Sequence, residues 1–217
     1  MKIPAWTASS IDSFITCPHK YYHLRVVKDV KDLPPSDSTL WGRRVHKAFE
    51  NAVNWGDPLP EDLKQWAPIV KQIQALKGEK LPEHKFAITE DFQPCKWGEA
   101  WCRGAADLVV IQGDEAIILD YKTGKRRPSD QLQLYAGFAF AHWPNLKKVH
   151  TGYVWLKDRK IDRQTYNVED KHKIWENWLP LVARMVRAYE SDQWQKRPSG
   201  LCKAWCPCHG FCEHCGV

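Results

Sequence analysis

The sequence lacks any long hydrophobic run. No segment approaches the roughly 20 apolar residues that a membrane-spanning helix requires. The opening residues, MKIPAWTASSIDSF, contain no apolar stretch of the kind found in a signal peptide. We therefore expect a soluble, intracellular protein that does not associate with a membrane.

Internal repeats and low-complexity segments are also missing. Charged residues make up 27% of the chain and hydrophobic residues 43%, which is typical of a globular protein and excludes a disordered one. A length of 217 residues predicts one domain with a substantial core and room for an appended module. The net charge of +6 favours an anionic partner.

The chain contains eight cysteines, and five of them crowd into residues 202–215, CKAWCPCHGFCEHC, together with two histidines. In a reducing compartment such thiols are metal ligands or free thiols rather than disulfides. Tetrahedral sulfur coordination suits both zinc and an iron–sulfur cluster, so the spacing alone leaves both open. The zinc alternative would use Cys206, Cys208, Cys212 and Cys215.

Residues 104–125, GAADLVVIQGDEAIILDYKTGK, predict a β-hairpin whose strands span residues 105–111 and 116–123. Folding the hairpin about Gly113 and Asp114 places Asp107 opposite Asp120. Lys122 then follows Asp120 on the same face of its strand. Two facing carboxylates repel each other unless a cation lies between them. A lysine beside that cation indicates a metal-dependent phosphodiesterase site.

The remaining periodicity predicts an α/β fold in which helices flank a mixed sheet of about four or five strands. Ser9 or Ser10 should cap the first helix, Ser129 the fourth, and Pro180 should kink or split the last. The expected helices span residues 9–23, 40–55, 61–77, 129–143 and 169–194, and the strands beyond the hairpin span residues 85–92, 149–156 and 161–168.

His46 is a further candidate because Gly42 and Glu50 lie one turn to either side of it on the expected helix 40–55. Glycine inside a helix costs about 1 kcal/mol relative to alanine, so Gly42 suggests that another segment approaches this face closely. The imidazole would then either supply a nitrogen ligand to a metal or pack as a buried histidine.

Several short motifs occur in an order that resembles the PD-(D/E)XK nuclease superfamily, and within it the RecB-like branch. That branch contains the nuclease domains of bacterial recombination helicases, CRISPR-associated RecB-type exonucleases and similar phage exonucleases. The resemblance covers nearly the whole chain, from about residue 9 to the C-terminus. It rests on Cys17-Pro18, Gly42-x3-His46-x3-Glu50, Gly104-x2-Asp107, Asp120-Tyr121-Lys122-Thr123-Gly124-Lys125 and Gln131-x3-Tyr135.

The resemblance implies a restriction-endonuclease-like core with a divalent metal site. His46, Asp107 and Asp120 would bind Mg²⁺ or Mn²⁺, with the main-chain carbonyl of Tyr121 as a further ligand. Hard oxygen ligands suit Mg²⁺, which agrees with this assignment.

The resemblance also assigns roles around the metal. Lys122 would orient or deprotonate the attacking water, and Gln131 and Tyr135 would position Lys122 or the DNA strand. Glu83 and Glu90, which precede the hairpin, are the candidates for a further carboxylate outside the ligand set.

In many RecB-like nucleases one N-terminal cysteine and three C-terminal cysteines hold a 4Fe–4S cluster. Here Cys17, Cys202, Cys206 and Cys212 would hold it. The usual spacing C-x2-C-x5-C is C-x3-C-x5-C in this chain, which leaves Cys208 and Cys215 over.

These implications describe a nuclease domain over residues 1–200 and a cysteine-rich tail over residues 201–217. The expected activity is that of a metal-dependent DNA exonuclease in recombination or DNA end processing, in the cytoplasm of a bacterium or a phage-infected cell. Recombination or CRISPR proteins are candidate partners, and the oligomeric state is open. The alternatives are a structure-specific endonuclease on the same core and a zinc-bearing nucleic-acid-binding module without catalysis.

Overall fold

The computed structural model describes residues 3–126 and 130–216. The chain forms two compact units, one built from residues 36–176 and the other from residues 1–35 together with residues 177–217. Each unit has its own packed interior. In the described part of the chain, no helix combines the length and apolar character needed to cross a membrane.

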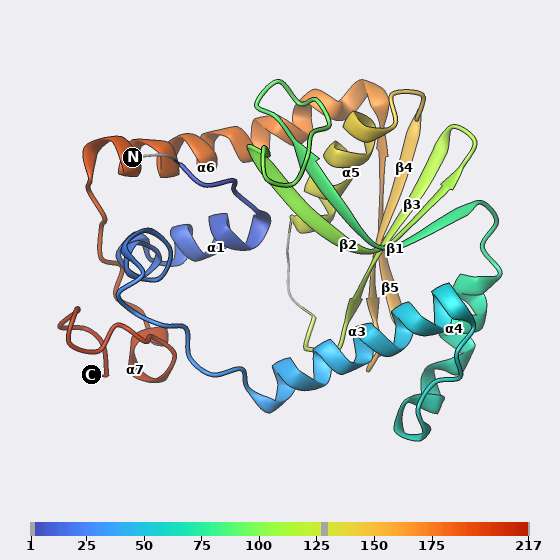
Figure 1. Ribbon diagram of the computed structural model, residues 1–217, viewed down its shortest axis with the longest axis horizontal. Helices are drawn as coiled ribbons and strands as arrows, with labels where there is room; N and C mark the ends of the chain where they lie inside the picture. The colour runs from blue at the N-terminus through green and yellow to red at the C-terminus, as the bar shows by residue number, and fades with distance from the viewer. Residues whose placement is uncertain (1–2, 127–129, 217) are drawn as a thin grey trace. The chain divides into compact units, whose positions relative to one another are not determined.

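The unit of residues 36–176 is organised around a five-stranded mixed sheet, which confirms the predicted α/β class (Figure 1). Neighbouring strands are antiparallel except for the parallel pair β3 and β4. In order across the sheet, the strands are β1 (Glu79–Ile88), β2 (Cys102–Gln112), β3 (Glu115–Lys122), β4 (Lys148–Trp155) and β5 (Lys160–Asn167).

Helices cover both faces of this sheet (Figure 1). One face carries α3 (Asp37–Trp55), the 3₁₀ helix η2 (Glu61–Trp66) and α4 (Ala67–Gln74); the other carries α5 (Gln131–His142). The Ser36 side chain caps α3 by accepting the Thr39 N–H. Gly56 ends it in a left-handed conformation with φ 72°, which glycine adopts without steric cost.

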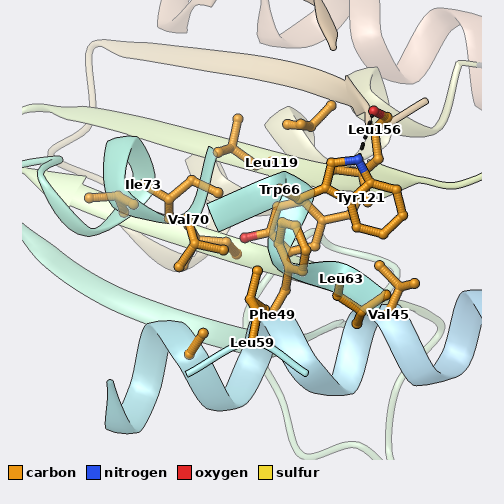
Figure 2. Close-up of a cluster of buried hydrophobic side chains, with 14 residues drawn as sticks. Val45, Phe49, Leu59, Leu63, Trp66, Val70, Ile73, Leu119, Tyr121 and Leu156 are labelled. Carbon is orange, nitrogen blue, oxygen red and sulfur yellow. Dashed lines mark hydrogen bonds between the residues drawn. The ribbon is translucent and has the colours of Figure 1, made fainter. Parts of the chain in front are cut away.

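A cluster of buried side chains joins α3, η2 and α4 to the sheet (Figure 2). The indole N–H of Trp66 donates to the carbonyl of Leu156 at 3.0 Å, so the largest ring of the cluster buries no unpaired donor. The cluster includes Val45 and Phe49 of α3 on one side and Leu119 of β3 on the other. Because Val45 and Phe49 flank His46 in the sequence, this packing fixes the rotation of the helix that carries the histidine.

The opposite face packs against α5 through aromatic rings. Phe138 stacks on Phe86 of β1 with ring centroids 5.3 Å apart. A Cβ at Gly137 of α5 would lie 2.9 Å from Trp175, so only glycine permits the first turn of α6 (Lys171–Ser191) to approach this closely.

The second unit consists of α1 (Ala8–Thr16), α2 (Pro18–Tyr21), the π-helix η1 (Tyr22–Val27), most of α6 and α7 (Leu201–Ala204). Its aromatic core contains Trp194, which stacks on Tyr21 at 6.3 Å, and the pair Trp6 and Trp178 at 5.8 Å. Both pairs join residues near the two ends of the chain.

Several predicted boundaries were wrong for identifiable reasons. The helix predicted over residues 9–23 breaks at Cys17, because a residue before proline is driven out of the helical region; Cys17 is extended, with ψ 105°. Thr7 rather than Ser9 or Ser10 caps α1, through a capping box with Ser10.

Other elements differ from the prediction in helix type or in length. The helix predicted over residues 61–77 is the 3₁₀ helix η2 followed by α4. The strand predicted over residues 85–92 is β1, which begins earlier at Glu79 and ends at Ile88. Helix α6 continues through Pro180 without splitting, and the 3₁₀ helix η3 (Val168–Asp170) precedes it. The predicted cap Ser129 lies outside the described residues, and α5 begins at Gln131.

Candidate active site

The hairpin of β2 and β3 has the predicted register. Leu108 pairs with Leu119 and Gln112 with Glu115, so the paired positions follow the symmetric fold about the turn. The ladder ends at Leu108 and Leu119, one pair before Asp107 and Asp120. Beyond that point the Asp107 carboxylate accepts the main-chain N–H of Tyr121 at 2.5 Å. The two acids therefore lie where the paired strands end.

Beside Asp107, the regular alternation of side chains between the two faces of the sheet is interrupted in strands β1 and β2. Leu108 packs in the core beneath α3 and α4, whereas a Cβ at Gly104 would lie 3.0 Å from Phe138 of α5. Even-numbered positions of β2 thus face opposite sides before and after Asp107. Opposite Asp107 in the register, Glu83 of β1 has φ 50°, a left-handed conformation that is costly outside glycine and clusters at functional sites. This break lets Asp107 and Glu83 gather around His46 of α3.

Helix α3 supplies His46 to the same place. The His46 Nδ1 atom lies 3.0 Å from Asp107 Oδ1, and Nε2 lies 2.8 Å from the carbonyl oxygen of Tyr121. The close approach comes from Gly42, one turn earlier, where an added Cβ would lie 3.3 Å from the Thr123 hydroxyl. The predicted close contact at Gly42 is thereby confirmed.

Asp120 and Lys122 form an ion pair at the end of β3, with Nζ 2.6 Å from Oδ2. The Lys122 ammonium also lies 5.2 Å from the ring centroid of Tyr153, the β4 residue that pairs with Asp120. Asp120 is only 4% exposed. The lysine is therefore held between a buried carboxylate and an aromatic face.

Burial and neighbouring charge change the acid–base properties of these groups. Burial, and then the charge of Asp107, raises the pKa of Asp120 to about 6. Burial alone would lower the pKa of His46, but the hydrogen bond and charge of Asp107 outweigh it and raise the pKa. Burial, and then the charge of Asp107, also raises the pKa of Glu83. The site thus concentrates negative charge around the buried Asp120, which favours cation binding.

Gln131 and Tyr135 lie one turn apart on α5. The Gln131 amide donates to the Tyr135 hydroxyl at 2.5 Å, and that hydroxyl donates to the carbonyl of Ala105 in β2. Burial, and then the charges of Asp120 and Asp107, raises the pKa of Tyr135, so its hydroxyl remains protonated. The two residues join α5 to the strand that presents Asp107.

The donor set fits a divalent cation. Ligand atoms of His46, Glu83 and Asp107 lie within 4.8 Å of one another, and the group combines two hard carboxylates with an imidazole. Asp120 falls outside this group but is close enough for the charges of the two aspartates to affect each other. Glu83 was expected only as a carboxylate outside the ligand set; Pro82 beside it is a sequence signal, because proline lacks the N–H that a strand ladder needs. Glu90 lies in an exposed turn beyond β1.

The mouth of the site is lined by Gly42, Arg43, His46, Lys47, Glu50 and Glu83. Lys47 pairs with Glu50 at 2.9 Å within this mouth. Two other nearby cations have structural partners, because Arg44 binds Asp62 and Arg126 binds Asp162. Arg43 and Lys47 are the basic side chains among the residues that line the opening.

The four cysteines predicted as cluster ligands line one cavity in the second unit. Cys17, Cys202, Cys206 and Cys212 all contribute to it. Cys17 also caps α2, its sulfur accepting the Lys20 N–H at 3.5 Å. The cavity therefore brings together thiols from the two ends of the chain.

Cys208 lines the same cavity, although it was left over in the predicted ligand set. It is 1% exposed and packs against Leu24 and Val30. Burial, and then the proximity of Cys206, raises the pKa of its thiol. Cys215 lies outside this lining, and its thiol donates to the carbonyl of Cys206 at 3.1 Å.

Comparisons with known proteins agree with this picture. The family model described as the PD-(D/E)XK nuclease superfamily matches residues 5–102 and 65–213. No curated protein matches the chain. Two solved structures share its fold: SSO0001, with 15% identity and a TM-score of 0.50, and a protein from Eubacterium rectale named "Putative exonuclease", with 13% identity and a TM-score of 0.51. The first alignment covers 98% of this chain and 87% of the other, and the second covers 88% and 84%.

Proposed function

The chain belongs to the PD-(D/E)XK nuclease superfamily, and from this premise we propose that it is a Mg²⁺- or Mn²⁺-dependent DNA exonuclease of the RecB-like branch. The observation that carries the proposal is the end of the β2–β3 ladder. There Asp107, Asp120 and Lys122 meet His46 from α3.

In the proposed site, His46, Asp107, Asp120 and the Tyr121 carbonyl hold the cation. The bound cation would polarise the scissile phosphate and lower the pKa of a water molecule. Lys122 orients that water and offsets charge on the phosphate. Its ion pair with Asp120 and the adjacent ring of Tyr153 hold its ammonium in place.

We further propose that Glu83 belongs to this ligand set. Its carboxylate is grouped with His46 and Asp107, and the left-handed backbone at Glu83 turns it toward them. Glu83→Gln keeps the size of the side chain but removes the charge. It should weaken Mn²⁺ binding measured by calorimetry about tenfold, whereas Glu90→Gln should not change it.

Gln131 and Tyr135 act as positioning residues in this proposal. Their hydrogen bonds end on the Ala105 carbonyl, two residues before Asp107. Tyr135→Phe removes that bond without creating a cavity. We expect it to lower kcat with little change in the melting temperature.

For the cysteine cavity we propose a 4Fe–4S cluster held by Cys17, Cys202, Cys206 and Cys212, which joins the first helices to the tail over residues 201–217. The gathering of these thiols at one cavity, one from near the N-terminus and three from the tail, supports the cluster. The zinc alternative would instead use the contacts that Cys206 makes with Cys208 and Cys215.

The exonuclease assignment is supported by the RecB-like motifs and by the name of the Eubacterium rectale protein of the same fold. DNA would be the substrate, consistent with the net charge of +6 and with Arg43 and Lys47 at the mouth. Recombination or DNA end processing, with recombination or CRISPR proteins as partners, is the context that the motifs imply.

The test compares end-labelled linear DNA with covalently closed circular DNA, each with Mg²⁺, with Mn²⁺ and with EDTA. An exonuclease releases label from linear DNA in the presence of metal and leaves the circle intact. Cleavage of the circle would instead indicate an endonuclease on the same core. Binding without cleavage in any metal would indicate a non-catalytic nucleic-acid-binding module.

A further inference from the structure

We propose that Trp97, Arg103 and Lys85 form a subsite that binds unpaired nucleotides of the DNA strand next to the cleaved phosphate. The proposal rests on the proposed nuclease function and extends it by naming where the strand runs. All three residues lie in the unit of residues 36–176, which also contains the candidate active site.

The position of the subsite follows from the two strands that carry the acids. Along β2, Arg103 and Ala105 precede Asp107 at steps of two residues and share its side of the strand. Along β1, Lys85 follows Glu83 at the same spacing and pairs with Ala105. At about 3.4 Å per residue, Arg103 lies about 14 Å along the strand from Asp107, a distance of a few nucleotides.

The chemistry of the three residues suits unpaired nucleotides. Trp97 is 41% exposed, although tryptophan residues in proteins are on average well buried. The Arg103 guanidinium lies 4.9 Å from its centroid, and the Lys85 ammonium lies 5.7 Å from it. Bases stack on exposed aromatic rings and on guanidinium planes, while the adjacent cations attract phosphates.

The loop that carries Trp97 is tied to the edge of the sheet. The Cys95 N–H donates to the Ala87 carbonyl at 3.0 Å, and the Trp101 N–H donates to the Ile88 carbonyl at 2.9 Å. These bonds lie to either side of Trp97 in the sequence. The ring is therefore presented from a fixed loop, which reduces the entropy lost on binding.

The flat ring favours single-stranded over double-stranded DNA as the occupant. Stacking needs the open face of a base, and inside a duplex both faces of each base are covered by its neighbours. A duplex would touch this surface only through its phosphates. Loss of the Trp97 ring should consequently weaken the binding of single-stranded DNA more than the binding of a duplex.

The binding experiment uses fluorescein-labelled oligothymidylates of increasing length and a blunt duplex, with anisotropy measured in EDTA so that no cleavage occurs. Trp97→Ala should weaken binding of the longer single strands about fivefold to a hundredfold, the range expected for losing one stacked base. Trp97→Phe should recover part of that loss. Trp55→Ala is the matched control, because Trp55 is 76% exposed in the same unit and lies on α3 away from this loop.

The two cations provide a second measurement that does not depend on the tryptophan. Lys85→Gln and Arg103→Gln should each reduce the slope of log affinity against log salt concentration by up to about 0.7, because each phosphate contact on a single strand contributes about that much. In Mn²⁺, Trp97→Ala should raise KM for single-stranded DNA and leave kcat unchanged.

Binding of single strands by folded Trp97→Ala as tight as by the wild type would overturn the subsite, as would an equal loss on the blunt duplex. Unchanged salt slopes in both cation variants would overturn it as well. Because binding is measured in EDTA, these results remain distinct from a failure of the proposed function, which would show as a wild-type protein that cleaves no DNA in any metal.

Discussion

The two candidate metal sites of this chain are built in different ways. The carboxylate site lies where β2 and β3 end their pairing, and extended strands and the long helix α3 set its geometry. The cysteine cavity lies among the four-residue helices α2 and α7 and turns, with a small buried core around Cys208. A sheet positions ligands whether or not a metal binds, whereas short turns depend on the metal to hold them. Loss of metal should therefore affect the two units differently.

The largest effect is expected from Asp120→Asn, which should reduce cleavage about 10²-fold or more while DNA binding survives. Asparagine preserves the volume and removes a carboxylate that is 4% exposed. The melting temperature should stay within a few degrees of the wild-type value. Cleavage by Asp120→Asn near the wild-type rate in Mg²⁺ would show that the site is assigned to the wrong residues.

Unlike Asp120→Asn, which should leave the melting temperature nearly unchanged, Cys17→Ser should lower both the metal content and the stability strongly. Wild-type protein purified without air should be brown, absorb broadly near about 400 nm and contain about four irons per chain. Cys17→Ser should lose most of that iron and melt at a lower temperature, because it removes one of the links between the two ends of the chain. Cys215→Ser is the matched control and should retain the iron.

Zinc at one atom per chain with no iron, together with a Cys17→Ser variant as stable as the wild type, would favour the zinc alternative.

The Cys208→Ser variant separates packing from metal binding in the same cavity. Cys208 is buried in the same cavity, so its replacement should cost stability through packing while the iron content stays near the wild-type value.

His46→Ala is expected to have an intermediate effect, weakening Mn²⁺ binding about tenfold or more and lowering the cleavage rate strongly. The imidazole contacts both Asp107 and the Tyr121 carbonyl, so its loss removes one ligand and loosens two others. Calorimetry measures the affinity. Unchanged Mn²⁺ affinity with a lowered melting temperature would instead identify His46 as a packing residue.

Gly104→Ala should have the smallest of these effects, a loss of about 1–3 kcal/mol in the free energy of unfolding. The added Cβ would lie 3.0 Å from Phe138 and 3.1 Å from Tyr135, so these two rings must give way by a few tenths of an ångström. Gly98→Ala is the control, since nothing lies within 4 Å of its Cβ position. Denaturant unfolding measures both. Equal free energies of unfolding for the two variants would mean that the added Cβ at position 104 causes no strain.

The sequence predicted the hairpin well because its signals are local. The turn at Gly113 and Asp114 fixes the register, and the apolar positions on either side fix the strands. The approach of α3 could also be predicted, because a glycine one turn before His46 costs helix stability without an evident benefit. Both inferences used residues close together in the sequence.

What the sequence did not predict depends on tertiary structure. The left-handed backbone at Glu83 reverses the side-chain direction in β1, and strict alternation gives no warning of it. The place of Cys208 in the cavity depends on packing against Leu24 and Val30, nearly the length of the chain away. The break at Cys17 was readable from Pro18, but helical periodicity on either side concealed it.

The central claim, that a metal-dependent nuclease site lies where β2 and β3 end their pairing, is tested most directly by measuring Mn²⁺ binding and DNA cleavage together in three proteins. The wild type should bind Mn²⁺ and cleave linear DNA. Asp107→Asn should lose both, and Lys122→Met should bind Mn²⁺ but not cleave, since Lys122 orients the water rather than holding the cation. Wild-type Mn²⁺ affinity in Asp107→Asn, or wild-type cleavage by Lys122→Met, would contradict the account.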